Sequence, residues 1–261
     1  MRLARVLTAG AEQYASVVEG PQGTAYALLS TDPFDSARPF RDACPSTGRL
    51  LGAHEVTLLP PVPATAKIVG IGRNYAGTET GSGEAPLFLK PHSALLAHGL
   101  PIVRPAFSDE IAFEAELAVV IGRTCRQVSR DEALSYVLGY TCANDVTARD
   151  AQRSDGQWTR AKGFDTSCPL GPWIVTGIDA RDLAITARRN GTVVQQGRTS
   201  QMLLDIAGLI ERVTAVMTLV PGDVLLTGTP VGAGALNLGD EIEVHIESVG
   251  TLSNPVVASP H

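Results

Sequence analysis

The chain has 261 residues, 44% of them apolar, and a formal net charge of −6 at pH 7. This balance predicts a folded globular protein, and an acidic chain without a run of basic residues argues against nucleic acid or anionic membranes as partners. No apolar run reaches the roughly 18 residues of a membrane span, and four scattered cysteines predict reduced, mostly buried thiols, so we expect a cytoplasmic protein.

The N-terminal part of the sequence predicts a small β-rich unit. Residues 17–20 and 26–29 have the character of short strands on either side of a Pro-Gln-Gly turn. Residues 58–63 are rich in proline and predict a stiff linker. We therefore expect a small N-terminal β-rich domain at residues 1–62 and a larger, catalytic domain at residues 63–261.

Strand-like apolar runs recur along the rest of the chain. We expect strands at residues 67–72, 87–91, 114–122, 140–144, 173–176, 224–227, 241–247 and 251–257. Residues 185–194 predict a hairpin, because Asn-Gly is a strong turn signal. Residues 76–84 are Gly-rich and lack apolar periodicity, which predicts a mobile loop.

Helices are expected at only a few places. Ser129 and Glu132 form a capping-box pattern at the start of residues 129–136, and further helices are expected at residues 146–152 and 200–217. Strands thus dominate the pattern. This predicts a mixed α+β fold with a rolled sheet and argues against a doubly wound α/β fold.

Glu114 and Glu116 stand two residues apart near the start of a predicted strand. Side chains at i and i+2 of a strand point to the same face, so these carboxylates would lie about 7 Å apart and repel each other. A divalent cation would neutralise them, and Mg²⁺, Mn²⁺ and Ca²⁺ prefer such oxygen ligands. The same spacing also fits two solvent-exposed acids at a strand end, so it leaves both interpretations open.

Asp145 and Lys162 are the next charged groups of interest. Asp145 follows an apolar strand and precedes a predicted helix, which fits either a third metal ligand or an N-cap. Lys162 is one of three lysines and has small and apolar neighbours. It fits a partner of carboxylates, a binder of an anionic substrate, or an ordinary surface lysine. The Gly- and Thr-rich turn at residues 227–234 offers backbone N–H groups that suit an anion.

Several other catalytic patterns are absent from the sequence. The chain has neither the Gly-Lys-Ser/Thr ending of a phosphate-binding loop nor the third glycine of a dinucleotide fingerprint. It also lacks a G-x-S-x-G motif, and its five histidines fall outside the candidate catalytic and binding motifs. These absences disfavour nucleotide, hydride and serine-hydrolase chemistry.

Six short blocks carry a family resemblance: residues 72–76 (GRNYA), 87–91 (LFLKP), 114–122 (EAELAVVIG), 139–152 (GYT and NDVTARDAQ), 162–172 (KGFD and CPLGP) and 227–230 (TGTP). In this order and spacing they resemble the fumarylacetoacetate hydrolase superfamily, in its compact acylpyruvase-like branch. That branch includes oxaloacetate decarboxylases and 2-hydroxyhepta-2,4-diene-1,7-dioate isomerases.

The resemblance implies a β-roll core with a small N-terminal domain, usually assembled as a homodimer. It implies Mg²⁺ or Mn²⁺ held by Glu114, Glu116 and Asp145, and a small 2-oxo acid or 1,3-dicarbonyl as the substrate that the metal chelates. By the same resemblance, we expect the substrate-binding residues to be Arg73, Tyr75, Gln152, Lys162 and Thr229.

One departure from the family pattern affects the expected reaction. Hydrolytic members have a His three residues after the Tyr of the Arg-Asn-Tyr block, and a Glu three residues beyond that His. Thr78 and Gly81 stand at these positions here. Glu79 is the neighbouring carboxylate, and we take it, with Lys162, as the candidate catalytic residues. A carboxylate alone does not reproduce the activation of water by a His–Glu pair near neutral pH.

We therefore expect enolate chemistry, which needs least from this loop: decarboxylation, or isomerisation and tautomerisation, of a small 2-oxo acid. One alternative is an acylpyruvate-type C–C hydrolase with a substitute base in the loop. The other is a catalytically quiet protein that binds metal and a metabolite without turnover.

Overall fold

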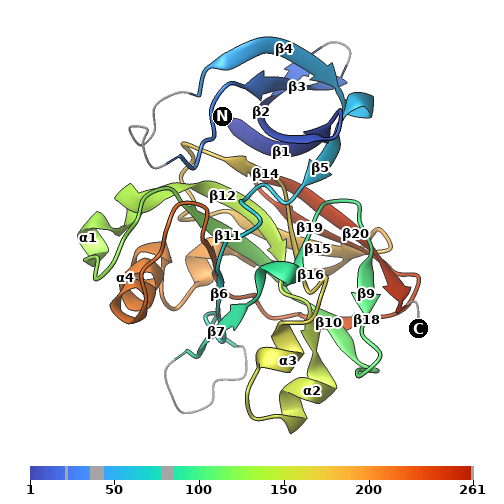
Figure 1. Ribbon diagram of the computed structural model, residues 1–261. Helices are drawn as coiled ribbons and strands as arrows, with labels where there is room; N and C mark the ends of the chain where they lie inside the picture. Colours follow the sequence, from blue (N-terminus) through green and yellow to red (C-terminus); the bar gives the residue numbers. More distant parts are fainter. Residues whose placement is uncertain (21–22, 36–43, 78–84, 260–261) are drawn as a thin grey trace.

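The computed structural model describes residues 1–20, 23–35, 44–77 and 85–259 (Figure 1). Strands make up most of the regular structure in these ranges, and the helices are few and short. The expected mixed α+β, strand-dominated fold is therefore confirmed. The loop expected at residues 76–84 falls mainly outside the described residues. No helix within them is both long and apolar enough to cross a membrane.

The N-terminal strands form an antiparallel meander at one end of the molecule (Figure 1). These strands are β1 (Arg2–Thr8), β2 (Ala11–Gly20), β3 (Gly23–Leu29), β4 (Ser46–Gly52) and β5 (Thr57–Leu59). The linker predicted at residues 58–63 is wrong at its start, because Leu58 and Leu59 belong to β5 and pair with Val6 and Arg5 of β1. Leu58 packs against the apolar cluster of these strands, which stabilises the extended pairing.

The meander continues into a 12-stranded sheet through the pairing of β1 with β14. The main path of this sheet runs β4-β3-β2-β1-β14-β12-β11-β17-β6-β7. Its remaining strands are β6 (Ile68–Ile71), β7 (Leu87–Lys90), β8 (Leu95–Leu96), β11 (Ala115–Ile121), β12 (Val137–Asn144), β14 (Cys168–Val175) and β17 (Val224–Leu226). The division into domains at residue 62 stays a prediction, and β1 joins the two parts by backbone hydrogen bonds.

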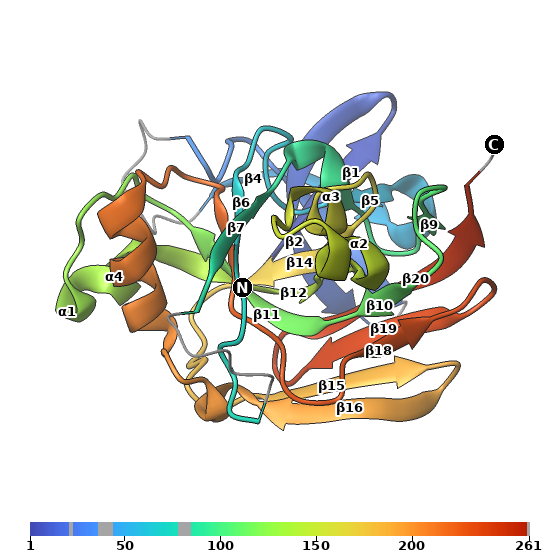
Figure 2. The same cartoon turned by 90° about the horizontal axis from the view of Figure 1, so that it is seen from below.

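Two smaller sheets complete the fold. One is ordered β13-β10-β18 and the other β16-β15-β19-β20-β9. Their strands are β9 (Ile102–Arg104), β10 (Ile111–Phe113), β13 (Thr147–Ala148), β15 (Ala184–Arg189), β16 (Thr192–Arg198), β18 (Gly234–Leu236), β19 (Glu241–Ile246) and β20 (Gly250–Ala258). Figure 2 shows β15, β16 and β19 side by side. The predicted hairpin is confirmed, with Asn190 and Gly191 at positive φ in its turn.

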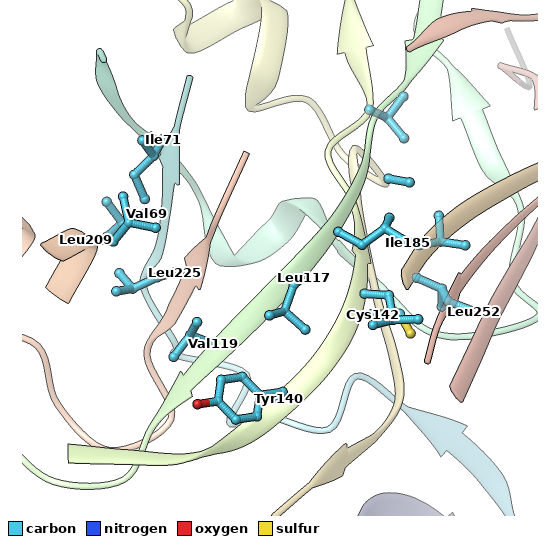
Figure 3. Close-up of a cluster of buried hydrophobic side chains, with 14 of the residues drawn as sticks. Val69, Ile71, Leu117, Val119, Tyr140, Cys142, Ile185, Leu209, Leu225 and Leu252 are labelled. Carbon is cyan, nitrogen blue, oxygen red and sulfur yellow. The ribbon is translucent and has the colours of Figure 1, made fainter. Parts of the chain in front are cut away.

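Strand β11 is buried on both faces and lies between two apolar clusters. Leu117 and Val119 belong to the larger cluster, which Figure 3 shows reaching from Leu209 to Leu252. Ala118 and Val120 belong to the second cluster, on the opposite face. Because side chains alternate along a strand, Glu114 and Glu116 share the face of Ala118 and Val120. Two carboxylates therefore stand at the end of an apolar face.

The helices of the chain are α1 (Arg130–Ala133), α2 (Arg149–Ser154), α3 (Thr159–Lys162) and α4 (Ile206–Val216), and the 3₁₀ turns are η1 (Ala53–Glu55), η2 (His92–Ala94), η3 (Leu134–Tyr136) and η4 (Thr199–Gln201). The helix predicted from residue 200 begins only at Ile206, after Asp205 accepts a hydrogen bond from the Gly208 amide. Ser200 and Gln201 belong to the 3₁₀ turn η4, and Met202 forms an isolated β-bridge with Tyr75. The Leu203 N–H then donates to the Asn74 carbonyl at 2.8 Å. Tertiary contact thus replaces the first turns of the predicted helix.

The helix predicted at residues 146–152 also starts later, at Arg149. Thr147 and Ala148 form β13 and pair with β10 instead. Asp145 is therefore too far from α2 to cap it, which removes one of its two possible roles. The four cysteines, all within the described residues, form no disulfide. Three of them are buried and Cys44 is partly buried, in line with the expected mostly buried thiols.

Candidate metal and substrate site

Three carboxylates meet at the end of β11 and β12. Because these strands are antiparallel and Ala115 is paired with Asn144, the residues just outside that pair are neighbours. The Asp145 amide accordingly donates to the Glu114 carbonyl at 2.9 Å. One carboxylate oxygen each from Glu114, Glu116 and Asp145 lies within 4.8 Å of the others, and all three residues are buried. This burial rules out the interpretation of Glu114 and Glu116 as solvent-exposed acids.

Two buried lysines contact this cluster. Lys162 Nζ lies 2.8 Å from Glu114 Oε2 and 2.5 Å from Asp145 Oδ2, and Lys90 Nζ lies 2.6 Å from Asp145 Oδ1. Burial favours the neutral form of Lys162, but Asp145 and Glu114 outweigh it and raise the pKa of Lys162. Burial likewise opposes ionisation of Asp145, but Lys162 and Lys90 hold its pKa below the usual value. Lys162 is therefore a fixed ammonium group, not a surface lysine.

Glu116 differs from the other two acids. The Gly228 amide donates to Glu116 Oε2 at 2.8 Å, and no Lys or Arg in the described part of the chain forms an ion pair with it. Burial, then Asp145 and Glu114, raise the pKa of Glu116 well above its usual value. Glu116 is therefore a buried carboxyl group without a cation in direct contact among the described residues. Three clustered, hard oxygen donors, one of them without a directly paired cation, fit a divalent cation such as Mg²⁺ or Mn²⁺.

Arg149 and Gln152 lie on the more open side of the cluster. Arg149 Nη2 is 2.7 Å from Glu114 Oε1, and its side chain keeps 25% of its surface exposed. Arg149 Nη1 also donates to Gln152 Oε1 at 2.8 Å, so Arg149 links the amide of Gln152 to Glu114. Both residues belong to α2, which packs beside α3 below the sheet (Figure 1). The predicted Gln152 is thus near the site, and Arg149 is a residue that the sequence did not single out.

Thr229 lies in a turn that is fastened to β11. Its hydroxyl donates to the Ala115 carbonyl at 2.8 Å, and the neighbouring Thr227 hydroxyl donates to the Leu117 carbonyl at 2.9 Å. Gly228 adopts φ +91° between them, and a Cβ there would approach the Asn74 Cβ to 2.9 Å. The Thr229 hydroxyl proton is therefore used within the protein, and its oxygen also accepts from Gln195 Nε2, so one lone pair remains for a substrate.

The remaining predicted site residues are Tyr75, Arg73 and Glu79. Tyr75 is buried, and burial followed by the charge of Glu116 raises its pKa, which places the phenol near the acid cluster. Arg73 is exposed and has φ +59°, a backbone conformation that is uncommon for a residue other than glycine. Glu79, with Thr78 and Gly81, lies outside the described residues. A groove of about 1230 Å³ beside β1 and β12 contains none of the predicted site residues.

Gln195 is a further residue that the sequence did not indicate. Its Nε2 donates to Thr229 Oγ1 at 2.9 Å and to the Pro230 carbonyl at 2.6 Å, and its Oε1 accepts from the Ala115 amide at 3.3 Å. The side chain is buried and connects β16 to the site. No short-range pattern predicts this, because the contact depends on how β16 packs against a distant turn.

Replacement of Gln195 by leucine is expected to destabilise the protein by about 2–4 kcal/mol, because it leaves the buried partners of Gln195 without hydrogen bonds. Urea unfolding of Gln195→Leu measures this loss. The control is Gln196→Leu, which changes the exposed neighbour on the same strand and is expected to cost less than about 0.5 kcal/mol. Equal stability of the two variants would contradict the anchoring role of Gln195.

Comparison with known proteins gives matches over nearly the whole chain. Residues 67–257 match the family described as "Fumarylacetoacetate (FAA) hydrolase C-terminal". A solved structure of 5-carboxymethyl-2-hydroxymuconate delta-isomerase from Mycobacterium smegmatis is 43% identical, with a TM-score of 0.91, and the match covers 99% of this chain and 100% of that one. Its similarity confirms the predicted β-roll fold.

Two further relatives carry other activities in their names. Oxaloacetate tautomerase Fahd2a of Rattus norvegicus is 39% identical over 80% of this chain and 72% of its own length. Maleylpyruvate hydrolase from Sphingobium sp. SYK-6, solved with manganese(II) and pyruvate, is 31% identical, with a TM-score of 0.80 and coverage of 99% of both chains. The relatives therefore include an isomerase, a tautomerase and a hydrolase.

Proposed function

We propose that this chain, which belongs to the fumarylacetoacetate hydrolase family, is a divalent-metal-dependent enzyme that acts on a small 2-oxo acid or 1,3-dicarbonyl through an enolate. The reaction would be a decarboxylation or an isomerisation or tautomerisation. The observation that carries the proposal is the buried cluster of Glu114, Glu116 and Asp145, fixed by the ammonium group of Lys162.

Glu114, Glu116 and Asp145 are the residues that would hold Mg²⁺ or Mn²⁺. When bound, such a cation supplies Lewis-acid polarisation of a carbonyl and charge stabilisation of an enolate. The manganese in the Sphingobium relative supports this assignment, and so does the raised pKa of Glu116, a buried acid without a directly paired cation in the described part of the chain. The choice between the two metals is left to measurement.

Lys162 would act as a donor. Its raised pKa keeps the ammonium protonated at neutral pH, so Lys162 is a poor base and a good stabiliser of negative charge on a substrate oxygen. Loss of CO₂ from a 3-carboxylated 2-oxo acid generates an enolate without prior removal of a C–H proton. This chemistry needs a donor and no base, which suits a site whose candidate base, Glu79, stands without a neighbouring histidine.

Arg149 and Gln152 would bind the carboxylate end of the substrate. The guanidinium group of Arg149 is partly exposed at the cluster, and such a group binds carboxylates with two parallel hydrogen bonds. We keep Arg73, Tyr75 and Thr229 as proposed substrate-binding residues. Tyr75 and Thr229 are supported by their positions beside the acid cluster and β11.

The proposal is tested by adding oxaloacetate to metal-loaded protein and following enolisation and decarboxylation, with and without a chelator. We expect metal-dependent turnover in the wild type and a loss of about 100-fold or more in Lys162→Met. The matched control is Lys67→Met. Lys67 forms its ion pair with Asp223, which lies outside the cluster of Glu114, Glu116 and Asp145. Turnover that persists in chelator, or survives in Lys162→Met, would contradict the proposal.

A hydrolase is the second candidate, because the Sphingobium relative is named as one. It requires a base that the described residues do not supply at the site, and its test follows in the Discussion. We also propose that the protein is a homodimer, as the family resemblance implies. Light scattering should then report the mass of two chains.

A further inference from the structure

An aromatic side chain stands next to the buried lysines on β7. Phe88 and Lys90 are two residues apart on this strand, so their side chains point to the same face. Lys90 reaches Asp145 at 2.6 Å, which shows that this face looks toward the acid cluster. Lys162 Nζ also lies 5.0 Å from the centre of the Phe88 ring. Phe88 is therefore a direct neighbour of the site.

A second aromatic ring extends this surface away from the acids. Trp158 caps the start of α3 and Lys162, four residues later, ends it, and the Lys162 amide donates to the Trp158 carbonyl at 2.9 Å. Residues with this spacing share one side of a helix. The Trp158 and Phe88 rings lie 5.5 Å apart at 64°. The Phe88 ring thus lies next to the charged group of Lys162, and the Trp158 ring lies next to Phe88.

The Phe88 ring lies on the backbone of the neighbouring strand β6, and the Trp158 ring lies on the residue that follows β6. A Cβ added at Gly70 would come within 2.1 Å of the Phe88 ring, and a Cβ added at Gly72 within 2.7 Å of the Trp158 ring. The rings therefore occupy the space that side chains at these glycines would fill. Phe88 and Trp158 are nevertheless only half-buried, so part of each residue stays accessible.

We propose that Phe88 and Trp158 form a subsite for the part of the substrate beyond its 2-oxo acid, and that this subsite favours a flat unsaturated or aryl group. The inference rests on the proposed function, which places the 2-oxo acid at the acid cluster. A flat group that leaves the cluster past Lys162 meets the Phe88 ring first and then the indole. Aromatic rings favour such partners in stacked or edge-to-face contact.

A pair of unreactive chelators tests the subsite without turnover. Oxamate has no ring, whereas N-phenyloxamate carries a phenyl ring on the same metal-binding group. Calorimetry with Mn²⁺-loaded protein should show N-phenyloxamate binding about three- to tenfold more tightly than oxamate. Trp158→Leu should remove this preference and leave the affinity for oxamate within twofold. Trp173→Phe, at the other tryptophan, is the matched control and should keep the preference.

Fluorescence gives a second measurement that needs no change at the subsite. The chain has two tryptophans, and the indole N–H of Trp173 donates to the Val249 carbonyl at 2.8 Å. In Trp173→Phe, all tryptophan emission therefore comes from Trp158. N-phenyloxamate should change this emission clearly more than oxamate does at equal occupancy. This measurement uses Trp173→Phe, so it still tests the subsite if the Trp158→Leu variant folds poorly.

The outcomes separate the subsite from the function on which it rests. Binding of oxamate with no gain from the phenyl ring, or equal emission changes with both ligands, would overturn the aromatic subsite and leave the proposed function standing. If neither chelator binds the Mn²⁺-loaded protein, the proposed function fails and the subsite fails with it. An unchanged preference for the ring in Trp158→Leu would also overturn the subsite.

Discussion

Addition of Mg²⁺ or Mn²⁺ to chelator-treated protein is expected to raise the melting temperature by about 5–10 °C. A ligand at 100 times its Kd stabilises the folded state by about 2.7 kcal/mol, and each kcal/mol raises the melting temperature of a protein of this size by about 2–4 °C. Glu116→Gln should remove most of this shift, because it keeps the shape and the hydrogen bond to Gly228 but loses the charge.

The metal-free form of Glu116→Gln is expected to be as stable as the metal-free wild type, or more stable. Burial and two neighbouring carboxylates disfavour the charge of Glu116, and glutamine carries none. The matched control is Glu110→Gln, which removes one negative charge from an exposed glutamate paired with Arg153. Differential scanning fluorimetry compares the three proteins. No shift in the wild type, or a full shift in Glu116→Gln, would count against the metal site.

The metal response should also grow with pH. The pKa of Glu116 is raised in the metal-free folded state, so protonation stabilises that state at low pH, and this stabilisation is lost as the pH rises through the raised value. A cation competes with the same proton and therefore binds more tightly at higher pH. The temperature shift at pH 7.5 should exceed the shift at pH 5.5. The reverse order would be inconsistent with Glu116 as a ligand.

Hydrolysis of acylpyruvates is expected to be at least about 100-fold slower than metal-dependent turnover of oxaloacetate. Loss of a general base typically costs about 10²- to 10⁴-fold, and Thr78 and Gly81 stand where the family resemblance implies a His and a Glu in hydrolytic members. Enolate stabilisation draws instead on the acid cluster and Lys162, which are present. Both rates should be measured with the same metal at the same concentration.

Restoring the pair tests the cause of this difference. The double variant Thr78→His with Gly81→Glu should raise acylpyruvate hydrolysis while leaving oxaloacetate turnover nearly unchanged. Thr78→His alone is the control, because a histidine without its carboxylate partner should raise acylpyruvate hydrolysis less than the double variant does. Efficient hydrolysis by the unmodified protein would refute this interpretation. Glu79 and Glu84 would then be the first bases to replace.

Local patterns in the sequence predicted most strands, because apolar alternation and turn residues act over a few positions. The spacing of Glu114 and Glu116 on one face could be predicted in the same way. Their burial could not, because it depends on packing against Lys90, Lys162 and the turn at Gly228.

The errors share a physical origin in contacts between distant segments. The helix predicted from residue 200 is shortened by hydrogen bonds from Leu203 and Leu204 to Asn74. The ion pair of Arg149 with Glu114 and the anchoring by Gln195 likewise join parts of the chain that no local window contains. A sequence pattern therefore locates the strands and the acidic residues. Tertiary packing decides which side chains form hydrogen bonds and ion pairs with those acids.

The pairing of β1 with β14 limits which N-terminal strands can be exchanged between relatives of this protein. Leu3 and Leu29 of the N-terminal meander are buried in the same cluster as Ala118 and Val120, on the face of β11 that carries Glu116. The meander thus forms part of the hydrophobic support under a proposed metal ligand. A chimera that exchanges the N-terminal strands between relatives would have to match the volumes of these side chains, or lose stability where the site can least tolerate movement.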